Sequence, residues 1–192
     1  MKKDIILAGV GGQGILSIAT VIGEAALAEG LFIKQAEVHG MSQRGGDVQS
    51  NLRISSDEIA SDLIPVGGAD IIVSLEPMEA LRYLPYLKKE GWIVTSSVPF
   101  VNIDNYPDIE ALKEHLDRLP NRVVLDVEQL AREAGAPVQA ANMVLLGAAV
   151  PMLDIEYEKI EAGVRRIFQR KGEEVTAKNI AALRAGYDNS KK

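Results

Sequence analysis

The residues best suited to chemistry are the glycines that follow the first apolar run of the chain. This glycine loop comes directly after residues 5–8, precedes a helix-forming stretch at Ile15, and reads Gly9-Val10-Gly11-Gly12-Gln13-Gly14. Glycines let a ligand approach the backbone closely because they carry no Cβ. The first amides of a helix lack internal partners and lie at the positive end of the helix dipole. The order of elements therefore predicts a cradle for phosphate, pyrophosphate or carboxylate. The alternative is a tight strand-to-helix turn that needs glycine only for packing.

The same loop has the spacing of a dinucleotide-binding fingerprint. Gly9, Gly11 and Gly14 occupy its three glycine positions. Such a site also needs an acidic residue at the end of the second strand to bind a ribose. Glu37 stands close to that place, 23 positions after Gly14. Two interpretations stay open: a free-standing Rossmann-like NAD(P) or flavin oxidoreductase, or another site for a phosphate-bearing ligand.

A second glycine-containing segment follows the strand predicted at residues 31–38, and reads His39-Gly40-Met41-Ser42-Gln43-Arg44-Gly45-Gly46. Arg44 can present two donors to a phosphate or carboxylate, or pair with a carboxylate at the surface. Gly45 and Gly46 form either a nest of oriented amides or a simple turn. His39 can carry a proton or contact the carboxylate of a substrate, or it can bond to backbone at the strand end.

Two further polar residues stand at informative places. Asn142 lies within the apolar segment 137–153, and a buried amide is costly unless it is paired. We expect it to bond to the backbone of a neighbouring loop rather than to a ligand. Glu76 follows the strand predicted at 69–75, where ligands gather in open α/β sheets. Its alternative role is a negative charge at a helix N-terminus.

Composition limits the function classes. The chain has 192 residues, of which 47% are hydrophobic, enough for one large domain with a substantial core. Its formal charge of -6 disfavours nucleic-acid binding, and no apolar run is long enough for a membrane span or signal peptide. We therefore expect a cytoplasmic protein. With no cysteine and two histidines, it cannot hold a disulfide or a thiolate-ligated iron–sulfur cluster by itself, and no metal site is expected.

Alternating strands and helices predict an α/β fold, a three-layer α/β/α sandwich with a mixed, mostly parallel sheet. The strand at 4–10 is continuously apolar, as a central parallel strand should be. A strand near 48–54 alternates apolar and polar residues and follows 31–38 without a helix, which predicts antiparallel pairing. We expect one domain over 1–187 and a loose tail at 188–192.

The remaining predicted elements are mostly helical. A short helix is expected at 57–63, and another from Glu76 to about Lys89 that Pro85 kinks or shortens. A strand is expected at 92–95 and another at 122–126. One buried helix is predicted over 137–153, and further helices are predicted at 109–119, 127–134, 157–171 and 175–187.

The two glycine segments together resemble the γ-type domain of the 2-oxoacid:ferredoxin oxidoreductases. The run from His39 to Gly46 is most similar to the indolepyruvate type, because pyruvate- and oxoglutarate-type relatives tend to carry a Glu-containing loop before Arg-Gly-Gly. The segment 142–148, Asn-Met-Val-Leu-Leu-Gly-Ala, also resembles the family in that region. The resemblance covers nearly the whole chain.

This resemblance implies a subunit of an enzyme that converts an arylpyruvate, CoA and oxidised ferredoxin to acyl-CoA, carbon dioxide and reduced ferredoxin. Thiamine diphosphate and the iron–sulfur clusters would lie on a large (α) subunit, so this chain would hold no cofactor and be inactive alone. It would reach ferredoxin through the complex, with neither nucleic acid nor a membrane as partner. The phosphates of CoA, or another anion, would bind at the glycine loop with Gln43, Arg44, Gly45 and Gly46, and Arg44 and His39 would face the large subunit.

Overall fold

One mixed sheet forms the middle of the molecule. The structure is a computed structural model that describes residues 1–39, 45–101 and 103–190, without the side chain of His39. In that part of the chain, six strands lie in the order β2-β3-β1-β4-β5-β6. Their bounds are β1 (Lys2–Val10), β2 (Phe32–His39), β3 (Asp47–Ser55), β4 (Ala69–Ser74), β5 (Leu87–Ser96) and β6 (Arg122–Leu125).

Strand direction confirms the mixed, mostly parallel sheet. β3 runs antiparallel to both β1 and β2. The pairs β1–β4, β4–β5 and β5–β6 are parallel. The predicted antiparallel pairing of the second and third strands is therefore confirmed. The sequence pattern did not indicate that β3 also separates β2 from β1.

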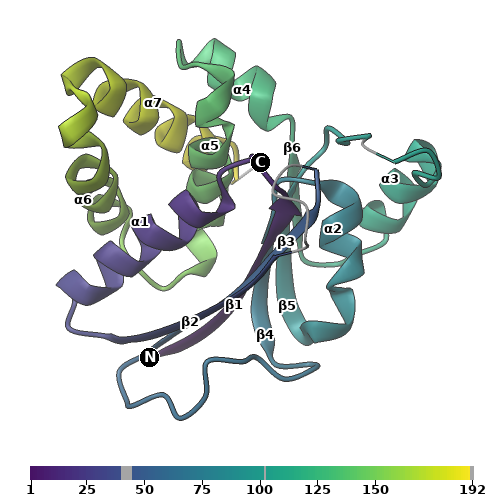
Figure 1. Ribbon diagram of the computed structural model, residues 1–192, viewed down its shortest axis with the longest axis horizontal. Helices are drawn as coiled ribbons and strands as arrows, with labels where there is room; N and C mark the ends of the chain where they lie inside the picture. The colour runs from purple at the N-terminus through teal and green to yellow at the C-terminus, as the bar shows by residue number, and fades with distance from the viewer. Residues whose placement is uncertain (40–44, 102, 191–192) are drawn as a thin grey trace.

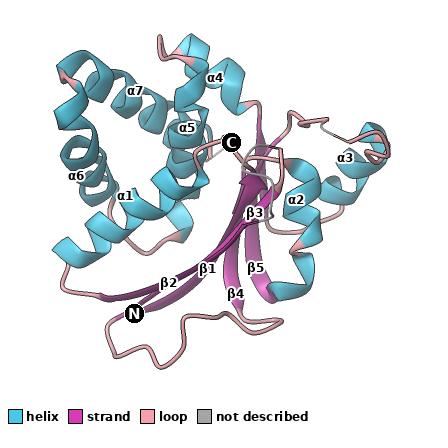
Figure 2. Cartoon of the chain, viewed as in Figure 1, coloured by secondary structure: helices cyan, strands magenta, loops and turns pink. Residues whose placement is uncertain are grey.

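Helices cover both faces of the sheet, which confirms the three-layer prediction (Figure 1). On one face lie α1, α5, α6 and α7, with α4 packed beside α5; α2 and α3 cover the other face, as the cyan helices on either side of the magenta strands in Figure 2 show. Their bounds are α1 (Ile15–Ala28), α2 (Pro77–Arg82), α3 (Ile109–Asp117), α4 (Val127–Glu133), α5 (Ala141–Ala149), α6 (Tyr157–Phe168) and α7 (Glu173–Asn189).

The core explains why β1 is apolar throughout. Successive side chains of a strand point to opposite faces of the sheet. Ile5 and Leu7 belong to the cluster under α1 and α5, whereas Ile6 and Ala8 belong to the cluster under α2. All four are 0% exposed. A strand buried on both faces carries no alternation, as predicted for this central position.

Helices α5 and α7 approach each other unusually closely. Every residue of α5 is buried. A Cβ placed on Gly147 of α5 would lie 1.9 Å from the carbonyl oxygen of Leu183 in α7. A Cβ on Gly186 of α7 would lie 1.8 Å from the carbonyl oxygen of Val144 in α5. The two backbones touch because glycines face each other at the crossing.

Two local predictions are wrong. Residues 57–63 are irregular rather than helical, and the guanidinium of Arg53 binds the carbonyls of Ser61 and Leu63, both at 3.0 Å. The helix expected to reach about Lys89 ends at Arg82, so its extent was wrong, although the predicted shortening by Pro85 is confirmed. A 3-10 turn around Pro85 follows, and β5 begins at Leu87 instead of residue 92. Proline lacks the amide needed to continue the helix and restricts the residue before it.

The last third of the chain also departs from prediction in detail. The apolar segment 137–153 is not one helix: α5 is flanked by the 3-10 helices Val138–Ala140 and Val150–Met152. The helix expected to reach residue 171 is α-helical only to Phe168 and continues as the 3-10 helix Gln169–Lys171. α7 extends to Asn189, so residues 188 and 189 of the expected loose tail are helical, while 191 and 192 lie outside the described residues.

Candidate functional site

The glycine loop turns sharply between β1 and α1. Gly12 has a φ of 103°, and Gly14, the N-cap of α1, has a φ of 82°, both in the left-handed region that glycine adopts most readily. The Gln13 side chain holds the turn together: its Oε1 accepts from the amide of Val10 at 2.8 Å. Its Nε2 donates to the carbonyl of Leu75, at the end of β4, at 3.4 Å. The Gln13 side chain thus stabilises the loop by bonding to Val10 before it and to Leu75 after β4.

The second glycine segment packs against the first. The amide of Gly11 donates to the carbonyl of Gly46 at 2.8 Å, and the amide of Gly45 donates to the carbonyl of Gly11 at 3.5 Å. The structure therefore brings together two segments that the sequence separates. Gln43 and Arg44 lie outside the described residues, and for His39 the backbone alone is described, at the end of β2 opposite Val48.

Asn142 joins the glycine loop to α5. Its Nδ2 donates to the carbonyl of Gly14 at 3.2 Å, which confirms the predicted bond to the backbone of a neighbouring loop. The residue is 6% exposed, and its Oδ1 is buried without a hydrogen-bond partner among the described residues. A Cβ on Gly14 would lie 2.6 Å from this Nδ2. A side chain at position 14 would therefore be strained by the positive φ and would displace the amide of Asn142.

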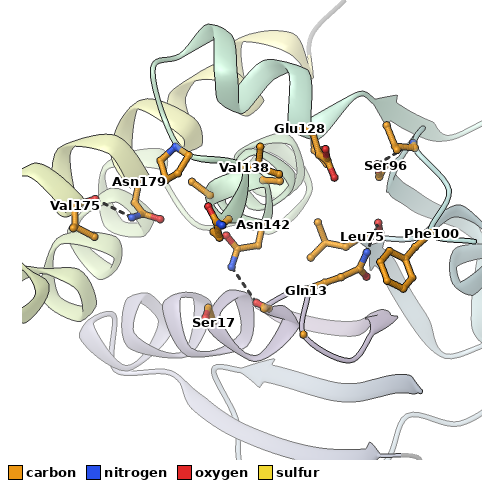
Figure 3. A pocket seen from close by; sticks show the side chains of 18 of the residues that line it. Gln13, Ser17, Leu75, Ser96, Phe100, Glu128, Val138, Asn142, Val175 and Asn179 are labelled. Atoms are coloured by element: carbon orange, nitrogen blue, oxygen red, sulfur yellow. Dashed lines mark hydrogen bonds between the residues drawn. The ribbon is translucent and has the colours of Figure 1, made fainter. Parts of the chain in front are cut away.

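A cavity of about 520 Å³ opens beside this loop (Figure 3). Residues 12–14 form one side, and side chains that follow the carboxyl ends of the sheet, such as Leu75 and Phe100, form another. Asn142 and Asn179 border it from α5 and α7. Ligands of open α/β sheets bind outside the carboxyl ends of the parallel strands. The cavity and the glycine loop together are therefore the candidate site.

The charges around the cavity come from segments that no sequence motif singled out. Glu128, in the first turn of α4, and Lys171, just before α7, both line it. The ammonium of Lys171 lies 5.3 Å from the ring centroid of Phe168. Sequence analysis missed these residues and Asn179, because they gather only through the packing of α4, α5 and α7. An amide within the helical pattern of 175–187 was the one sequence signal for Asn179.

Glu76 serves the helix rather than the cavity. It is 0% exposed and caps α2, with Oε2 accepting from the amide of Glu79 at 2.8 Å. Oε1 accepts from the amide of Phe100 at 3.3 Å and from the hydroxyl of Tyr106. The alternative role as a helix N-terminal charge is therefore confirmed. Burial and the bond to Glu76 raise the pKa of the Tyr106 hydroxyl.

A buried carboxyl lies one turn further along α2. Glu79 is 2% exposed, and its Oε2 lies 2.9 Å from Nε of Arg82. Loss of solvation raises the pKa of Glu79, and the guanidinium of Arg82 offsets part of that increase. Glu79 lies in the α2 layer and does not line the cavity beside the glycine loop.

The sheet order does not support the dinucleotide interpretation. In the Rossmann arrangement the second strand neighbours the first, which places its terminal carboxylate near the ribose. Here β3 lies between β1 and β2, so Glu37 stands on an edge strand, one strand removed from the glycine loop. Its Oε1 accepts from Nε2 of Gln35 at 2.6 Å. The glycine spacing of the fingerprint is thus present, but the strand arrangement that would place Glu37 beside a ribose is not.

Within the described ranges, no group of three or more His, Asp or Glu side chains is arranged to hold a metal ion. In that same part of the chain, no single helix is long and apolar enough to cross a membrane. Only the segments Val127–Glu133 and Val138–Met152 taken together have the length and apolar composition of a membrane span, and the two are bent by 119° relative to each other.

Comparison with known proteins finds relatives that match nearly the whole chain. The subunit IorB of indolepyruvate oxidoreductase from Thermococcus kodakarensis is 40% identical, over 86% of this chain and 86% of that subunit. The IorB subunit from Archaeoglobus fulgidus is 33% identical, over 99% of this chain and 96% of that subunit.

A solved structure shares the fold. The 2-oxoglutarate:ferredoxin oxidoreductase from Magnetococcus marinus, with 2-oxoglutarate, coenzyme A and succinyl-CoA bound, superposes with a TM-score of 0.77 at 24% identity. The match covers 99% of this chain but only 31% of that longer polypeptide. The sequence model of the pyruvate ferredoxin/flavodoxin oxidoreductases matches residues 4–189. With a match of this extent and relatives identical at a third or more of the aligned positions, the chain belongs to the pyruvate ferredoxin/flavodoxin oxidoreductase family.

Proposed function

We propose that this chain is the small subunit of an indolepyruvate-type 2-oxoacid:ferredoxin oxidoreductase. The observation that carries the proposal is its similarity, over 86–99% of its length, to IorB subunits. The complex would oxidise an arylpyruvate with CoA to an acyl-CoA and carbon dioxide, and two electrons would pass to ferredoxin. We expect it to act in the cytoplasm.

We infer that the electron carriers belong to another subunit. Iron–sulfur clusters are held by cysteine thiolates, and this chain has no cysteine. The sequence also shows no thiamine-diphosphate motif. We therefore place thiamine diphosphate and the clusters on a large partner subunit, and we expect the isolated small subunit to be colourless and inactive.

The share of this chain in the reaction is to bind CoA. The amides of Gly12, Gly14 and the first turn of α1 lie at the positive end of a 14-residue helix, where a phosphate is favoured, whereas those of Gly11 and Gln13 already donate to backbone carbonyls. The cavity beside the loop has room for the chain that follows the phosphates. Arg44 would add a charged donor, and His39 would lie toward the large subunit. In support, the Magnetococcus marinus relative binds coenzyme A.

Purification of the tagged chain from its source cell tests the subunit role. A large, brown, iron-containing partner should copurify, and the complex alone should reduce ferredoxin with an arylpyruvate and CoA. Turnover of a 2-oxoacid by the small subunit in isolation would refute the proposal.

Kinetics of the complex test the role of Arg44. Arg44→Ala should raise the KM for CoA or for the oxoacid. Arg118→Ala is the matched control, because Arg118 is an exposed residue just after α3, on the other face of the sheet. Unchanged kinetics of Arg44→Ala in an intact complex would contradict the assignment.

A further inference from the structure

The segment between β5 and α3 displays large apolar side chains to solvent. Four of them, within ten positions, are between 41% and 62% exposed: Phe100, Val101, Ile103 and Ile109. We call these four residues the apolar loop surface. A single exposed apolar residue is common, but a group of this kind indicates a surface that another protein covers. The residues from 98 to 112 include Asp104, Asp108 and Glu110 and no Lys or Arg, so the charges of this segment are all negative.

A buried carboxylate holds this segment in place. Oε1 of Glu76 accepts hydrogen bonds from the amide of Phe100 at 3.3 Å and from the hydroxyl of Tyr106, and Glu76 itself is 0% exposed. The amide of Tyr106 also donates to the carbonyl of Ile103 at 3.3 Å. The exposed apolar side chains therefore stand on a backbone that is anchored on both sides of them. A surface that is ordered in advance loses less conformational entropy when a partner binds.

The apolar loop surface adjoins the cavity beside the glycine loop. Phe100 lines this cavity and is also 46% exposed, so it stands at the rim (Figure 3). Under the proposed function, the ligand of the cavity meets a cofactor that the large subunit holds. The large subunit must then pack against the rim, and an apolar contact there would exclude water from the site.

A second copy of this chain fits the surface less well than a different protein does. A two-fold contact places the same residues of the two copies against each other. Asp104 and Glu110 would then face the same carboxylates of the other copy, and like charges across an interface are unfavourable. The surface suits a partner that brings apolar side chains with Lys or Arg around them.

We propose that the large subunit packs on the apolar loop surface and places Lys or Arg side chains against Asp104 and Glu110. This inference rests on the proposed function and deepens it, because it assigns the face of the chain on which the partner lies. The rim of the cavity is then closed by the subunit that holds the cofactor.

A cysteine footprint tests the proposal in the complete complex. The chain has no cysteine, so Val101→Cys gives it a single thiol, and alkylation by iodoacetamide is read from the mass of the small subunit. Val66→Cys is the matched control: Val101 and Val66 are 62% and 71% exposed, but Val66 precedes β4, whereas Leu75 at the other end of that strand lines the cavity. In the complex, with rates normalised to the same variants in urea, position 101 should react at least about tenfold more slowly than position 66. Equal rates would overturn the inference.

Polar substitutions measure how much the surface contributes to assembly. Val101→Asn/Ile103→Asn should raise the dissociation constant of the complex at least about tenfold, because apolar anchors of an interface carry much of its affinity. Leu63→Asn/Val66→Asn changes two exposed aliphatic residues away from the cavity and should alter the constant less than about twofold. Mass photometry over a dilution series gives both constants, and similar values for the two double variants would contradict the assignment.

Two other outcomes are distinguishable from these. Slow alkylation of Val101→Cys in the small subunit alone, at a concentration where it is dimeric, would assign the surface to a second copy and overturn the inference. The proposed function fails separately, if no iron-containing large subunit copurifies with the chain.

Discussion

Gly147 and Gly186, at the crossing of α5 and α7, give a prediction in which helix propensity and tertiary packing have opposite effects on stability. In a helix interior, replacing glycine by alanine stabilises by roughly 0.5–1 kcal/mol when nothing else changes. In Gly147→Ala, however, the new Cβ would lie 1.9 Å from the carbonyl oxygen of Leu183, whereas real Cβ atoms essentially never come within 3.0 Å of such an atom. The obstacle is backbone, so rotation of a side chain cannot relieve it.

The helices must therefore separate, although α5 is buried on every side. Overpacking of a filled core costs about 1–3 kcal/mol and occasionally more. We expect a cost of overpacking in the upper part of this range, which exceeds the stabilisation from helix propensity. The free energy of unfolding should therefore fall by about 2 kcal/mol. For a chain of this length, the loss corresponds to a decrease in Tm of roughly 4–8 °C.

Gly23→Ala is the matched control, because it makes the same change within α1. The nearest atom to its new Cβ is Cδ1 of Ile33 at 3.9 Å, an ordinary contact. Here we expect a gain of roughly 0.5–1 kcal/mol. Urea unfolding followed by circular dichroism measures both variants. The reasoning is refuted if Gly147→Ala is as stable as the wild type, or if the two variants shift in the same direction.

Three further predictions concern buried polar groups. Arg53→Met should lower the free energy of unfolding by up to about 3–5 kcal/mol, because it leaves the buried carboxylate of Asp4, 2.7 Å from Nε, with the exposed ammonium of Lys2, at 3.6 Å, as its remaining charged partner; urea unfolding showing a loss below about 1 kcal/mol would contradict this. Tyr106→Phe should cost about 1–3 kcal/mol by the same measurement, since it removes a donor from the buried carboxylate of Glu76, and an unchanged urea midpoint would show that the hydroxyl is dispensable. For Glu79, burial raises the pKa in the folded state above 4.5, so the protonated carboxyl favours folding below pH 4.5 and that contribution is lost as pH rises through the folded-state pKa. Glu79→Gln should therefore gain stability relative to the wild type as pH rises through this window, and a difference independent of pH in parallel titrations of unfolding would exclude the assigned shift.

Several features of the site could be predicted from local sequence. Glycines between an apolar strand and a helix indicate a tight turn, and the φ values of Gly12 and Gly14 agree. The backbone bond of Asn142 followed from the cost of burying an amide in an apolar segment. The pairing of β2 with β3 followed from the missing helix between them.

Other local predictions were wrong in kind or in extent. Residues 57–63 are not helical, and Arg53 binds the carbonyls of Ser61 and Leu63 in this segment. Pro85 shortened α2 as predicted, but the helix ends at Arg82, earlier than the apolar pattern indicated. Glu37 had the right spacing for a ribose contact but stands on the wrong strand, because β3 lies beside β1.

By itself, the sequence determined the layered α/β architecture, the tight glycine turn, and the lack of any thiolate ligand for an iron–sulfur cluster. Periodicity, glycine content and the absence of a residue type are local or compositional properties, so no contact map is needed to interpret them. Only the tertiary structure decided the order of strands, the cavity beside the turn and the contact between Asn142 and Gly14. The last two depend on packing between segments more than a hundred residues apart, such as Gly14 and Asn142, and the energy of such contacts leaves no periodic trace in the chain.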